Sequence, residues 1–295
     1  MIIVNLKGGL GNQMFQYAAG LALAEKHHVD LKLDFAFLQT STGSAEFTKR
    51  RFELEIFDVN FILASESEIF AFKGNQHKLT YRAIRKFFPS LIRKKIYRYD
   101  ALNFDPSFAQ LGNETYLDGY FQSEYYFLKA ETAIRSHFRF KNPPAGKNEK
   151  LAEEISSCNS VSIHVRRGDY LSEINRGLFG NICTLYYYSN AISIIQKEIT
   201  APHFYIFSDD VAWVKGNLKI DSPVTFVDFN TGENSFEDMR LMSLCRHNII
   251  ANSSFSWWAA WLNDNPSKKV IAPSKWINDP GCVVDDVIPK SWQRT

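Results

Sequence analysis

The sequence predicts an α/β protein of two domains, each built on a parallel sheet that carries helices on both faces. Short apolar runs with the period of a strand alternate with segments of helical period along most of the chain, which is typical of a doubly wound parallel sheet. The length of 295 residues suits two domains of ordinary size. Residues 141–148, rich in proline, asparagine and lysine, separate the halves and are the clearest linker.

The first half begins with a strand that leads into a glycine-rich turn and a helix, one face of which contains Met14, Ala18 and Leu21. An irregular polar region and a basic segment follow before the pattern returns to a strand and a helix. The predicted elements are a strand at 2–6, a helix at 12–26, a strand at 29–34, an irregular region at 40–60, a basic helix or helix pair at 79–98, a strand at 115–121 and a helix at 123–138.

The second half alternates more regularly. Its third helix opens with Ser235 and Asp238 at the spacing of a capping box, and it is expected to bury Phe236, Met239 and Met242. The predicted elements are a helix at 148–157, a strand at 160–165, a helix at 184–198, strands at 203–208 and 224–228, a helix at 235–246, a strand at 248–251, a helix at 254–264 and a strand at 269–272.

Composition excludes several classes of protein. Hydrophobic residues make up 45% and aromatic residues 15% of the chain, which is enough for sizeable cores and unlike a disordered protein. The net charge of +2 gives no indication of nucleic-acid binding. The cysteines, Cys158, Cys183, Cys245 and Cys282, are far apart and lack the spacing of a zinc site, so reduced thiols in a cytosol are expected.

Neither a signal peptide nor a membrane span is expected. Residues 1–6 are too short for a leader, and no apolar run approaches the roughly 20 residues of a membrane span, so we expect a cytoplasmic protein. A basic stretch at residues 82–98 contains Phe87 and Phe88. This stretch is either a solvated face or a weak contact with the surface of the inner membrane, where a lipid-linked glycan would lie.

The most informative stretch is Val161-Ser-Ile-His-Val-Arg-Arg-Gly-Asp-Tyr170. Its alternating apolar residues predict a strand, and at the strand end are His164, Arg166, Arg167 and Asp169. Adjacent guanidiniums at such an end are costly unless an anion meets them, and arginine presents a planar fork of donors that matches phosphate oxygens. Ligands bind at strand ends in α/β sheets. The alternative is a salt bridge between an arginine and Asp169 on the domain surface.

Two further strands end in polar clusters. The strand at 203–208 ends in Ser208 and the acidic pair Asp209 and Asp210. One of the two acids is expected to be only a cap of the following helix. The strand at 248–251 leads to a cluster at an expected helix start, where hydroxyls and free N–H groups bind anions. This cluster comprises Asn252, Ser253, Ser254, Phe255 and Ser256. Since a carboxylate accepts both the ring N–H and the exocyclic amine of guanine, the three strand ends predict a purine nucleoside diphosphate site, with guanine favoured.

The chain resembles the α-1,2-fucosyltransferase family, whose members transfer L-fucose from GDP-fucose. The resemblance runs in family order from residue 2 to about residue 276. The matching segments are Gly8-Gly-Leu-Gly-Asn-Gln-Met-Phe-Gln-Tyr17, Asp118-Gly-Tyr-Phe-Gln-Ser123, His164-Val-Arg-Arg-Gly-Asp169, Phe207-Ser-Asp-Asp210 and Asn252-Ser-Ser-Phe-Ser-Trp-Trp258. The complete ordered set is far more specific than any one of these segments.

The two α/β halves and the resemblance both imply the GT-B architecture, in which two Rossmann-like domains have the active site in the cleft between them. We expect an acceptor-binding domain at residues 1–145 and a GDP-fucose-binding domain at residues 146–275. Residues 276–295 form a C-terminal segment for which a return to the first domain is left open.

The resemblance implies a bacterial galactoside α-1,2-fucosyltransferase, which transfers L-fucose from GDP-β-L-fucose to O2 of a terminal β-galactose with inversion. The donor is a substrate, and no cofactor or metal is expected because the sequence has no D-x-D triplet. The partners are GDP-fucose and a galactose-terminated oligosaccharide. Two alternatives stay open: a non-catalytic module that binds a GDP-sugar or glycan, and a glycosyltransferase that uses another GDP-sugar or forms another fucosyl linkage.

Arg166 is the first choice for the diphosphate, because a fixed cation stabilises the charge that grows on the leaving phosphate. His164 is expected to contact the nucleotide, with a core histidine bonded to the backbone as the alternative. The sequence does not rank Asp209 and Asp210 as readers of guanine. The expected catalytic residues are Arg166, Asn12, His164 and Asp169. The expected donor-binding residues are His164, Arg166, Arg167, Ser208, Asp209, Asp210, Asn252, Ser253, Ser254, Phe255, Ser256 and Gly11.

The glycine-rich turn at residues 8–11 invites comparison with a dinucleotide fingerprint, with Asp34 near the place of its ribose-binding acid. Met14 stands at the third glycine position, which argues against an NAD site. The resemblance instead places Asn12 in the active site. The acceptor-binding residues it implies are Asn12, Gln13, Asp118, Tyr120 and Gln122. Asp118 and Asp169 are the alternatives for a general base, and Trp257, Trp258 and Trp261 have the spacing of helix core.

Overall fold

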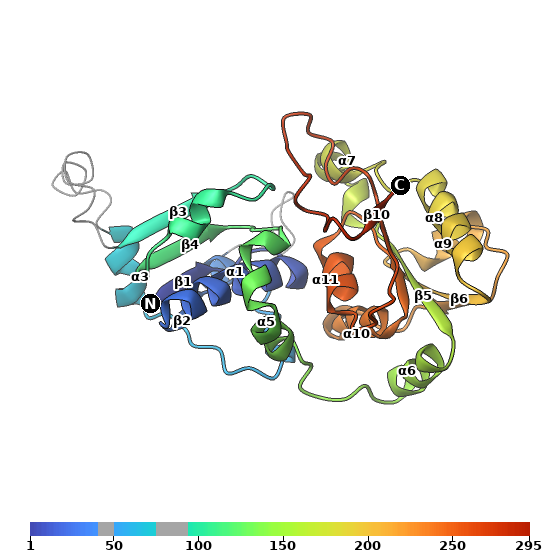
Figure 1. Ribbon diagram of the computed structural model, residues 1–295, viewed down its shortest axis with the longest axis horizontal. Coiled ribbons are helices and arrows are strands. Elements are labelled where there is room, and N and C mark those ends of the chain that lie inside the picture. Colours follow the sequence, from blue (N-terminus) through green and yellow to red (C-terminus); the bar gives the residue numbers. More distant parts are fainter. Residues whose placement is uncertain (41–49, 75–93) are drawn as a thin grey trace. The chain divides into compact units, whose positions relative to one another are not determined.

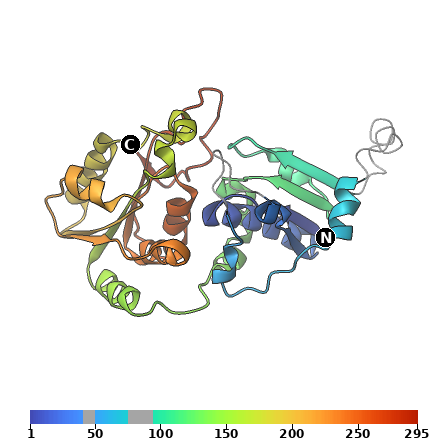
Figure 2. The same ribbon diagram turned by 180° about the vertical axis from the view of Figure 1, so that it is seen from behind.

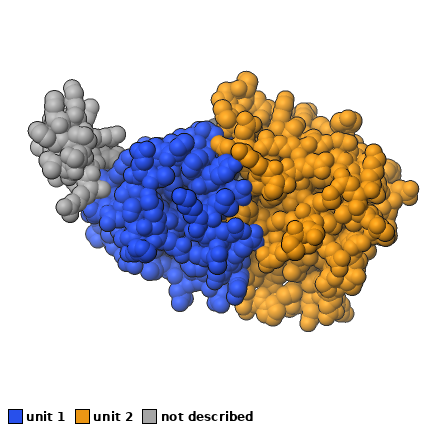
Figure 3. Space-filling model, in the orientation of Figure 1, with its two compact units in different colours: residues 1–139 blue, residues 140–295 orange. Residues whose placement is uncertain are grey.

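The computed structural model describes residues 1–40, 50–74 and 94–295. The chain divides into two compact units, residues 1–139 and residues 140–295 (Figure 3). Each unit contains one sheet, and every described strand pair is parallel. The predicted α/β class with parallel sheets is therefore confirmed.

Unit 1 contains a four-stranded sheet in the order β2-β1-β4-β3. Its strands are β1 (Ile2–Asn5), β2 (Leu31–Asp34), β3 (Lys95–Tyr99) and β4 (Thr115–Gly119). The helix α1 (Leu10–His27) follows β1 and packs against it (Figures 1 and 2). Since the strands are parallel, the residues that follow β1 and β4 lie at one edge of the sheet, where ligands bind in such folds.

The helix α1 matches the predicted helix, and its predicted face is buried, with exposed fractions of 0% for Met14 and Ala18 and 7% for Leu21. Gly20 lets the helix approach β1 closely, because a Cβ there would lie 2.3 Å from Cγ2 of Val4. This close packing fixes the glycine-rich turn at the carboxyl end of β1.

The basic helix predicted at 79–98 falls largely on residues 75–93, outside the described part of the chain. Its last part is wrong, because Lys95–Tyr99 form β3 and pair with β4. Tyr97, in the middle of that strand, is buried. Tyr97 and Tyr99 lie on one face at the spacing of a strand. The high content of lysine and arginine in this segment concealed that spacing.

The helix predicted at 123–138 is correct only at its end, where α5 (Glu131–His137) forms. Before α5 the chain makes two short turns, and Phe127 between them has φ −140° and ψ 1°, which interrupts a helix. The remaining elements of the unit are α2 (Ala36–Thr40), η1 (Leu54–Ile56), α3 (Glu66–Lys73), η4 (Pro106–Gln110), η5 (Glu124–Tyr126) and η6 (Leu128–Ala130).

Unit 2 contains a six-stranded sheet in the order β10-β9-β8-β5-β6-β7. Helices α8 and α9 cover one face and α10 and α11 the other, as predicted for a doubly wound sheet (Figures 1 and 2). The strands are β5 (Asn159–Val165), β6 (Pro202–Ser208), β7 (Val224–Val227), β8 (His247–Ile249), β9 (Val270–Ala272) and β10 (Gln293–Arg294). The helices and turns are α6 (Lys147–Ser157), η7 (Asp169–Leu171), α7 (Glu173–Phe179), α8 (Leu185–Glu198), α9 (Val211–Asn217), η8 (Gly232–Asn234), α10 (Phe236–Leu244) and α11 (Ser254–Leu262).

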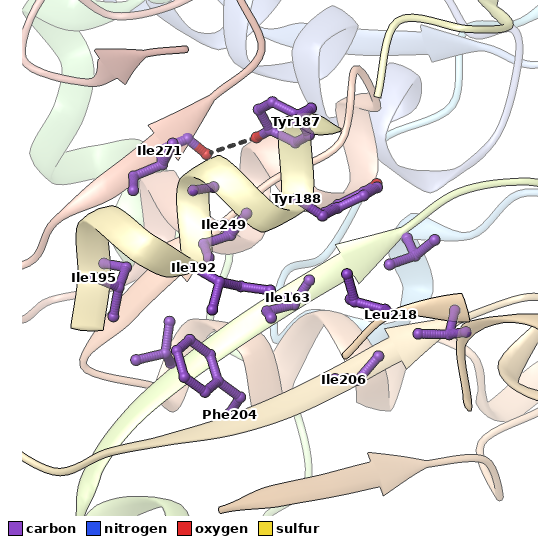
Figure 4. Packing of buried hydrophobic residues seen from close by; sticks show 14 residues of the cluster. Ile163, Tyr187, Tyr188, Ile192, Ile195, Phe204, Ile206, Leu218, Ile249 and Ile271 are labelled. Atoms are coloured by element: carbon purple, nitrogen blue, oxygen red, sulfur yellow. Dashed lines mark hydrogen bonds between the residues drawn. The ribbon is translucent and has the colours of Figure 1, made fainter. Parts of the chain in front are cut away.

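The core under α8 holds the sheet of unit 2 in place (Figure 4). Ile192 and Ile195 pack with the apolar side chains of β5 and β6, and burial of each such side chain contributes roughly 1.5–3 kcal/mol. The hydroxyl of Tyr187 donates to the carbonyl oxygens of Ile250 at 2.6 Å and Ile271 at 3.2 Å. The strand that leads to the hydroxyl cluster is thereby fixed in position.

The opposite face of β5 is polar although it is buried. Asn248 Nδ2 donates to Ser162 Oγ at 2.8 Å, and Asn263 Nδ2 donates to Asn248 Oδ1 at 2.8 Å. These partners satisfy polar groups that would otherwise be costly to bury. The alternation along β5 places His164 on this same face, where its ring centroid lies 5.8 Å from that of Phe255 at the start of α11.

The capping box predicted at the start of α10 is wrong. Ser235 is the N-cap, but its backbone is already helical and its side chain forms no capping bond, because the η8 turn leads directly into the helix. Met239 and Met242 are buried as predicted, whereas Phe236 is partly exposed.

The three tryptophans of α11 are core residues, as predicted: Trp257 and Trp258 are 0% exposed and Trp261 is 4% exposed. Trp257 Nε1 donates to the carbonyl oxygen of Val287 at 2.7 Å, which ties α11 to the C-terminal segment. That segment ends in β10, which pairs with β9 within unit 2.

Candidate functional site

The carboxyl ends of β8, β5 and β6 lie side by side, because these strands are neighbours in the sheet. The register pairs Val165 at the end of β5 with Ser208 at the end of β6, and Ile163 with Ile249 of β8. The structure therefore gathers the basic cluster, the acidic pair and the hydroxyl cluster at one edge of one sheet.

Asp209 holds the loop that follows β5. Its carboxylate accepts hydrogen bonds from the backbone N–H groups of Arg167 at 2.9 Å and Gly168 at 3.1 Å, and it pairs with Nη1 of Arg166 at 2.9 Å. At position 168 a Cβ would lie 2.8 Å from Asp209 Oδ2, so a residue other than glycine would displace the carboxylate that holds the loop. Arg166 thus extends from a preformed loop and is oriented by a charge-assisted contact.

Arg167 has a different partner. Its guanidinium carbon lies 3.6 Å from the centroid of the Trp213 ring, and its Nε donates to Asp210 Oδ2 at 3.1 Å. Asp210 also accepts from the N–H of Trp213 at 3.1 Å and so caps α9, which confirms that one of the two acids is a cap. That backbone bond and the guanidinium lower the pKa of Asp210. Ser208 Oγ accepts from the N–H of Asp210 at 3.0 Å.

His164 is 6% exposed at the end of β5. Burial, and next the charge of Arg166, lower the pKa of His164 to about 4, although Asp209 acts in the opposite sense. The imidazole is therefore neutral near pH 7. Its Nδ1 is buried without a hydrogen-bond partner in the described part of the chain, unlike a core histidine bonded to the backbone.

The serines after β8 differ in their surroundings. Ser253, the N-cap of α11, is 8% exposed, and the hydroxyls of Ser253 and Ser254 form no hydrogen bond within the described ranges. Ser256 is fully buried, and its hydroxyl lies 3.5 Å from the carbonyl oxygen of Ala251 and 3.4 Å from that of Ser253. The Ser256 hydroxyl therefore serves the start of the helix, whereas the hydroxyls of Ser253 and Ser254 have no such task among the described residues.

Asn252 is buried, and its amide binds groups of its own unit. Nδ2 donates to the carbonyl oxygens of Phe179 and Trp276, each at 3.2 Å, and Oδ1 accepts from Cys183 Sγ at 3.5 Å. These contacts favour a structural role for the Asn252 amide over direct contact with the sugar nucleotide. Asp169 begins the η7 turn, directly after the loop that Asp209 holds.

In unit 1 the structure brings Asn12 and Gln122 together. Gln122 Nε2 donates to Asn12 Oδ1 at 2.7 Å, across the edge where β1 and β4 end. Gly8 has φ +80°, a conformation that favours glycine, and a Cβ there would lie 2.6 Å from Asn12 Nδ2. The glycine-rich turn is therefore shaped around Asn12, and Gly11 is buried in the first turn of α1.

Gln13 lies in the core below this turn, with an exposed fraction of 0%. Its Nε2 donates to the carbonyl oxygens of Gly8 at 2.9 Å and Arg51 at 2.8 Å, and its Oε1 accepts from the N–H of Glu53 at 2.9 Å. Gln13 therefore fixes the turn from below, although the sequence assigned it to the acceptor.

Asp118 is surrounded by donors at the end of β4. Its Oδ1 accepts from Asn5 Nδ2 at 3.0 Å and Lys7 Nζ at 3.2 Å, and its Oδ2 accepts from Arg98 Nε at 2.9 Å. Burial alone would raise the pKa of Asp118, but these three donors together lower it. The Lys7 ammonium also lies 4.9 Å from the centroid of the Tyr120 ring. The carboxylate is thus held ionised, which makes it a weak base.

A model of the family described as glycosyl transferase family 11 matches residues 1–294. The chain belongs to this family. Alpha-1,2-colitosyltransferase of Escherichia coli is 33% identical over 100% of the chain and 98% of its own length. The O-antigen biosynthesis glycosyltransferase WbnK of Escherichia coli is 34% identical, over 92% of the chain and 93% of its own length. Human galactoside alpha-(1,2)-fucosyltransferase 1 is 31% identical, but only over 35% of the chain and 28% of its own length.

Solved structures share the fold. Fucosyltransferase NodZ from Bradyrhizobium superimposes with a TM-score of 0.53 at 16% identity, over 90% of this chain and 96% of its own. NodZ alpha-1,6-fucosyltransferase co-crystallized with GDP also gives a TM-score of 0.53 at 16% identity, over 88% and 91% of the two chains. The predicted GT-B fold class is confirmed. This member of family 11 is a glycosyltransferase.

Asp34, which the NAD alternative would assign to a ribose, is 2% exposed and accepts from Tyr116 at 2.5 Å and Lys73 at 3.0 Å. Within residues 1–40, 50–74 and 94–295, no group of three or more His, Cys, Asp or Glu side chains could hold a metal ion. No described helix has the length and apolarity needed to cross a membrane.

Sequence reasoning missed two features of unit 2. Tyr170 lies beside Arg166, and its place at the end of the motif was the only signal. Arg240 on α10 is 5% exposed, and its Nε lies 3.4 Å from Glu237 Oε2. Beside them, burial raises the pKa of Asp238 to about 7, with a further contribution from the charge of Glu237. Because the sequence of this segment predicts a capping box, the charged cluster was not identified from it.

Proposed function

We propose that the protein is an inverting galactoside α-1,2-fucosyltransferase, which transfers L-fucose from GDP-β-L-fucose to O2 of a terminal β-galactose. The observation that carries the proposal is Arg166, held by Asp209 on a preformed loop at a strand end of a family 11 glycosyltransferase. In this proposal unit 2 binds the donor and unit 1 binds the acceptor through Asn12, Tyr120 and Gln122.

The chemistry assigned to Arg166 is stabilisation of the leaving group. As the bond between sugar and phosphate breaks, negative charge grows on the β-phosphate of GDP, and a preorganised guanidinium stabilises that charge more than the ground state. Ser253 and Ser254 add hydroxyl donors to the phosphates, and His164 contacts the nucleotide as a neutral ring. A single displacement at the β-linked centre gives an α-linked product.

The sequence does not rank Asp209 and Asp210 as the residue that binds guanine. An ionised carboxylate has about four acceptor positions, and guanine needs two of them for its ring N–H and its amine. Asp209 already accepts from three donors, whereas Asp210 accepts from two, namely Trp213 and Arg167. We therefore assign guanine to Asp210, the acid with more acceptor capacity left, which departs from the expectation that the capping acid has no further role.

A second donor has support of its own. The relative from Escherichia coli that matches the whole chain is named an alpha-1,2-colitosyltransferase. Colitose is L-fucose without its 3-hydroxyl group, so GDP-colitose would meet the same phosphate and guanine contacts. A site built to hydrogen-bond a hydroxyl rejects the analogue that lacks it by about 10⁴-fold or more, whereas an apolar pocket discriminates far less. The ratio of the two donors' kcat/KM values therefore identifies the natural sugar.

The test is a donor panel of GDP-fucose, GDP-colitose, GDP-mannose and UDP-galactose with lactose as acceptor, and with the product linkage determined by NMR. The proposal expects turnover of GDP-fucose to 2′-fucosyllactose. Preference for GDP-colitose would select the second donor on the same mechanism. A β-linked product would refute inversion, and an α-1,3 or α-1,6 product would refute the acceptor assignment. GDP-sugar binding without any turnover would favour a non-catalytic module.

Two expectations stay proposals without structural support. Weak contact with a membrane surface would use the basic stretch at 82–98, of which residues 82–93 lie outside the described part. A cytoplasmic location follows from the same proposal of an acceptor presented at the inner membrane.

A further inference from the structure

Tyr170 is fixed beside Arg166 by contacts at both ends of its side chain. Its ring centroid lies 5.9 Å from the guanidinium carbon of Arg166, within the distance of about 6 Å at which a ring attracts a cation. Its hydroxyl donates to the backbone carbonyl of Asn252 at 2.8 Å. The ring also stacks on Phe179, with centroids 5.3 Å apart and planes inclined by 23°.

Asn252 makes this support rigid. The side chain is 3% exposed, and its Nδ2 donates to the carbonyl oxygens of Phe179 and Trp276. One buried amide therefore joins the end of α7 to the segment after β9. Phe179 is at once a hydrogen-bond partner of Asn252 and the stacking partner of Tyr170, so Asn252 fixes both the hydroxyl and the ring face of the tyrosine.

We propose that Tyr170 is a positioning residue that sets the direction of the Arg166 guanidinium. Asp209 pairs with Nη1 of Arg166, and the ring of Tyr170, anchored by Asn252, has its centroid 5.9 Å from the same guanidinium and comes from a different element. Two separate contacts thereby restrict the plane of the fork. The plane matters because an arginine fork binds a phosphate through two parallel hydrogen bonds only in a narrow range of orientations.

The proposal rests on the proposed function, in which Arg166 meets the diphosphate of the donor. A displacement of about 1 Å in a catalytic group costs up to roughly 10²-fold in rate. Because the guanidinium contributes most when charge grows on the leaving phosphate, its displacement lowers kcat more than it raises the donor KM.

The test uses two substitutions that remove different parts of the side chain. Tyr170→Phe removes the bond to Asn252 and is expected to lower kcat about tenfold, and Tyr170→Leu also removes the ring and is expected to lower it about 10²-fold. The matched controls are Tyr186→Phe and Tyr186→Leu, at a tyrosine of the same unit that is 81% exposed. These controls are expected to leave kcat and KM unchanged.

A double-mutant cycle separates positioning from general damage to the fold. If Tyr170 acts through Arg166, adding Tyr170→Leu to Arg166→Lys causes little further loss. If the tyrosine only stabilises the fold, the two losses multiply. Multiplied losses, or unchanged kcat in both Tyr170 variants, would overturn the proposal. Tyr170→Phe, checked by its melting temperature, provides the cycle should the leucine variant fail to fold.

GDP binding, measured by calorimetry on the same variants, distinguishes the two levels of failure. A parent protein that transfers no sugar from any donor contradicts the proposed function. If Tyr170→Leu lowers GDP affinity in the parent but has no effect on GDP affinity when Arg166→Lys is already present, that result would still support the positioning of Arg166 by Tyr170. Equal loss in both backgrounds would contradict it.

Discussion

Asp209→Asn tests whether the orientation of Arg166 depends on one carboxylate. In the parent, Oδ1 accepts from the N–H of Arg167, while Oδ2 accepts from the N–H of Gly168 and pairs with Arg166. The asparagine amide has only one oxygen. In either orientation of the amide, its NH₂ group therefore faces at least one of the N–H donors that the two carboxylate oxygens accept from in the parent. The substitution also removes the negative charge opposite the guanidinium.

The expected magnitude follows from these contacts. A hydrogen bond to a charged group contributes about 1.5–3 kcal/mol, and the side chain of Asp209 is 25% exposed, so water replaces part of what is lost. We expect the free energy of unfolding to fall by about 2 kcal/mol. With Arg166 released from its anchor, kcat/KM for the donor is expected to fall about 10²-fold, equivalent to about 2.7 kcal/mol of transition-state stabilisation.

The assay measures initial rates of donor turnover together with thermal unfolding. The matched control is Asp210→Asn, the neighbouring acid, which caps α9 and pairs with Arg167. Loss of that cap is expected to lower the melting temperature and GDP affinity, with a smaller effect on kcat. Turnover within threefold of the parent in Asp209→Asn, together with a 10²-fold loss of kcat in Asp210→Asn, would refute the reasoning and exchange the tasks of the two acids.

Three further predictions follow from the same site. Arg166→Lys keeps the charge but loses the fork, so kcat/KM is expected to fall about 10²-fold in steady-state assays, and near-normal turnover would move the phosphate contact elsewhere. Excess EDTA is expected to leave the parent's rate unchanged, and activity that only manganese or magnesium restores would contradict a guanidinium as the main charge at the phosphate. His164 has a depressed pKa of about 4 against an ordinary value of 6.5, so its contribution to stability is full above pH 6.5 and is lost as the pH falls toward 4. Chemical denaturation across that window is expected to show a shallower loss in His164→Gln than in the parent, and equal slopes would refute the assignment.

Much of the fold could be predicted because periodicity reports burial directly. Val161 and Ile163 alternate along β5 because that face packs under α8. An apolar run revealed β6, and the spacing of Met14, Ala18 and Leu21 on one helix face revealed α1. The strand β3 and the interruption before α5 escaped prediction because another signal masked the period. Charge concealed β3, where Tyr97 is the buried residue. A run of helix-forming residues concealed the interruption at Phe127, whose backbone is set by tertiary packing and not by propensity.

The chemical groups of the site could be predicted from the sequence, but which arginine pairs with which acid could not. Arg166 and Arg167 are adjacent, as are Asp209 and Asp210, so the sequence allows either arginine to meet either acid. The structure selects one pairing because the loop after β5 wraps around Asp209, which Gly168 permits. Hydrogen bonding separates the serines in the same way, since the Ser256 hydroxyl bonds to the backbone and the Ser253 hydroxyl does not within the described part of the chain.

The distribution of fixed charge bears on how the bond breaks. Arg166, which the proposed function places at the donor phosphates, has contacts from two elements. Asp118, which the proposed function places near the acceptor, is held ionised by three donors, so its affinity for a proton is below that of an ordinary carboxylate. A base of this kind accepts little of the proton of an acceptor hydroxyl early in the reaction. Stabilisation is therefore concentrated on the leaving phosphate, which favours a transition state in which departure of GDP leads and the acceptor loses its proton late.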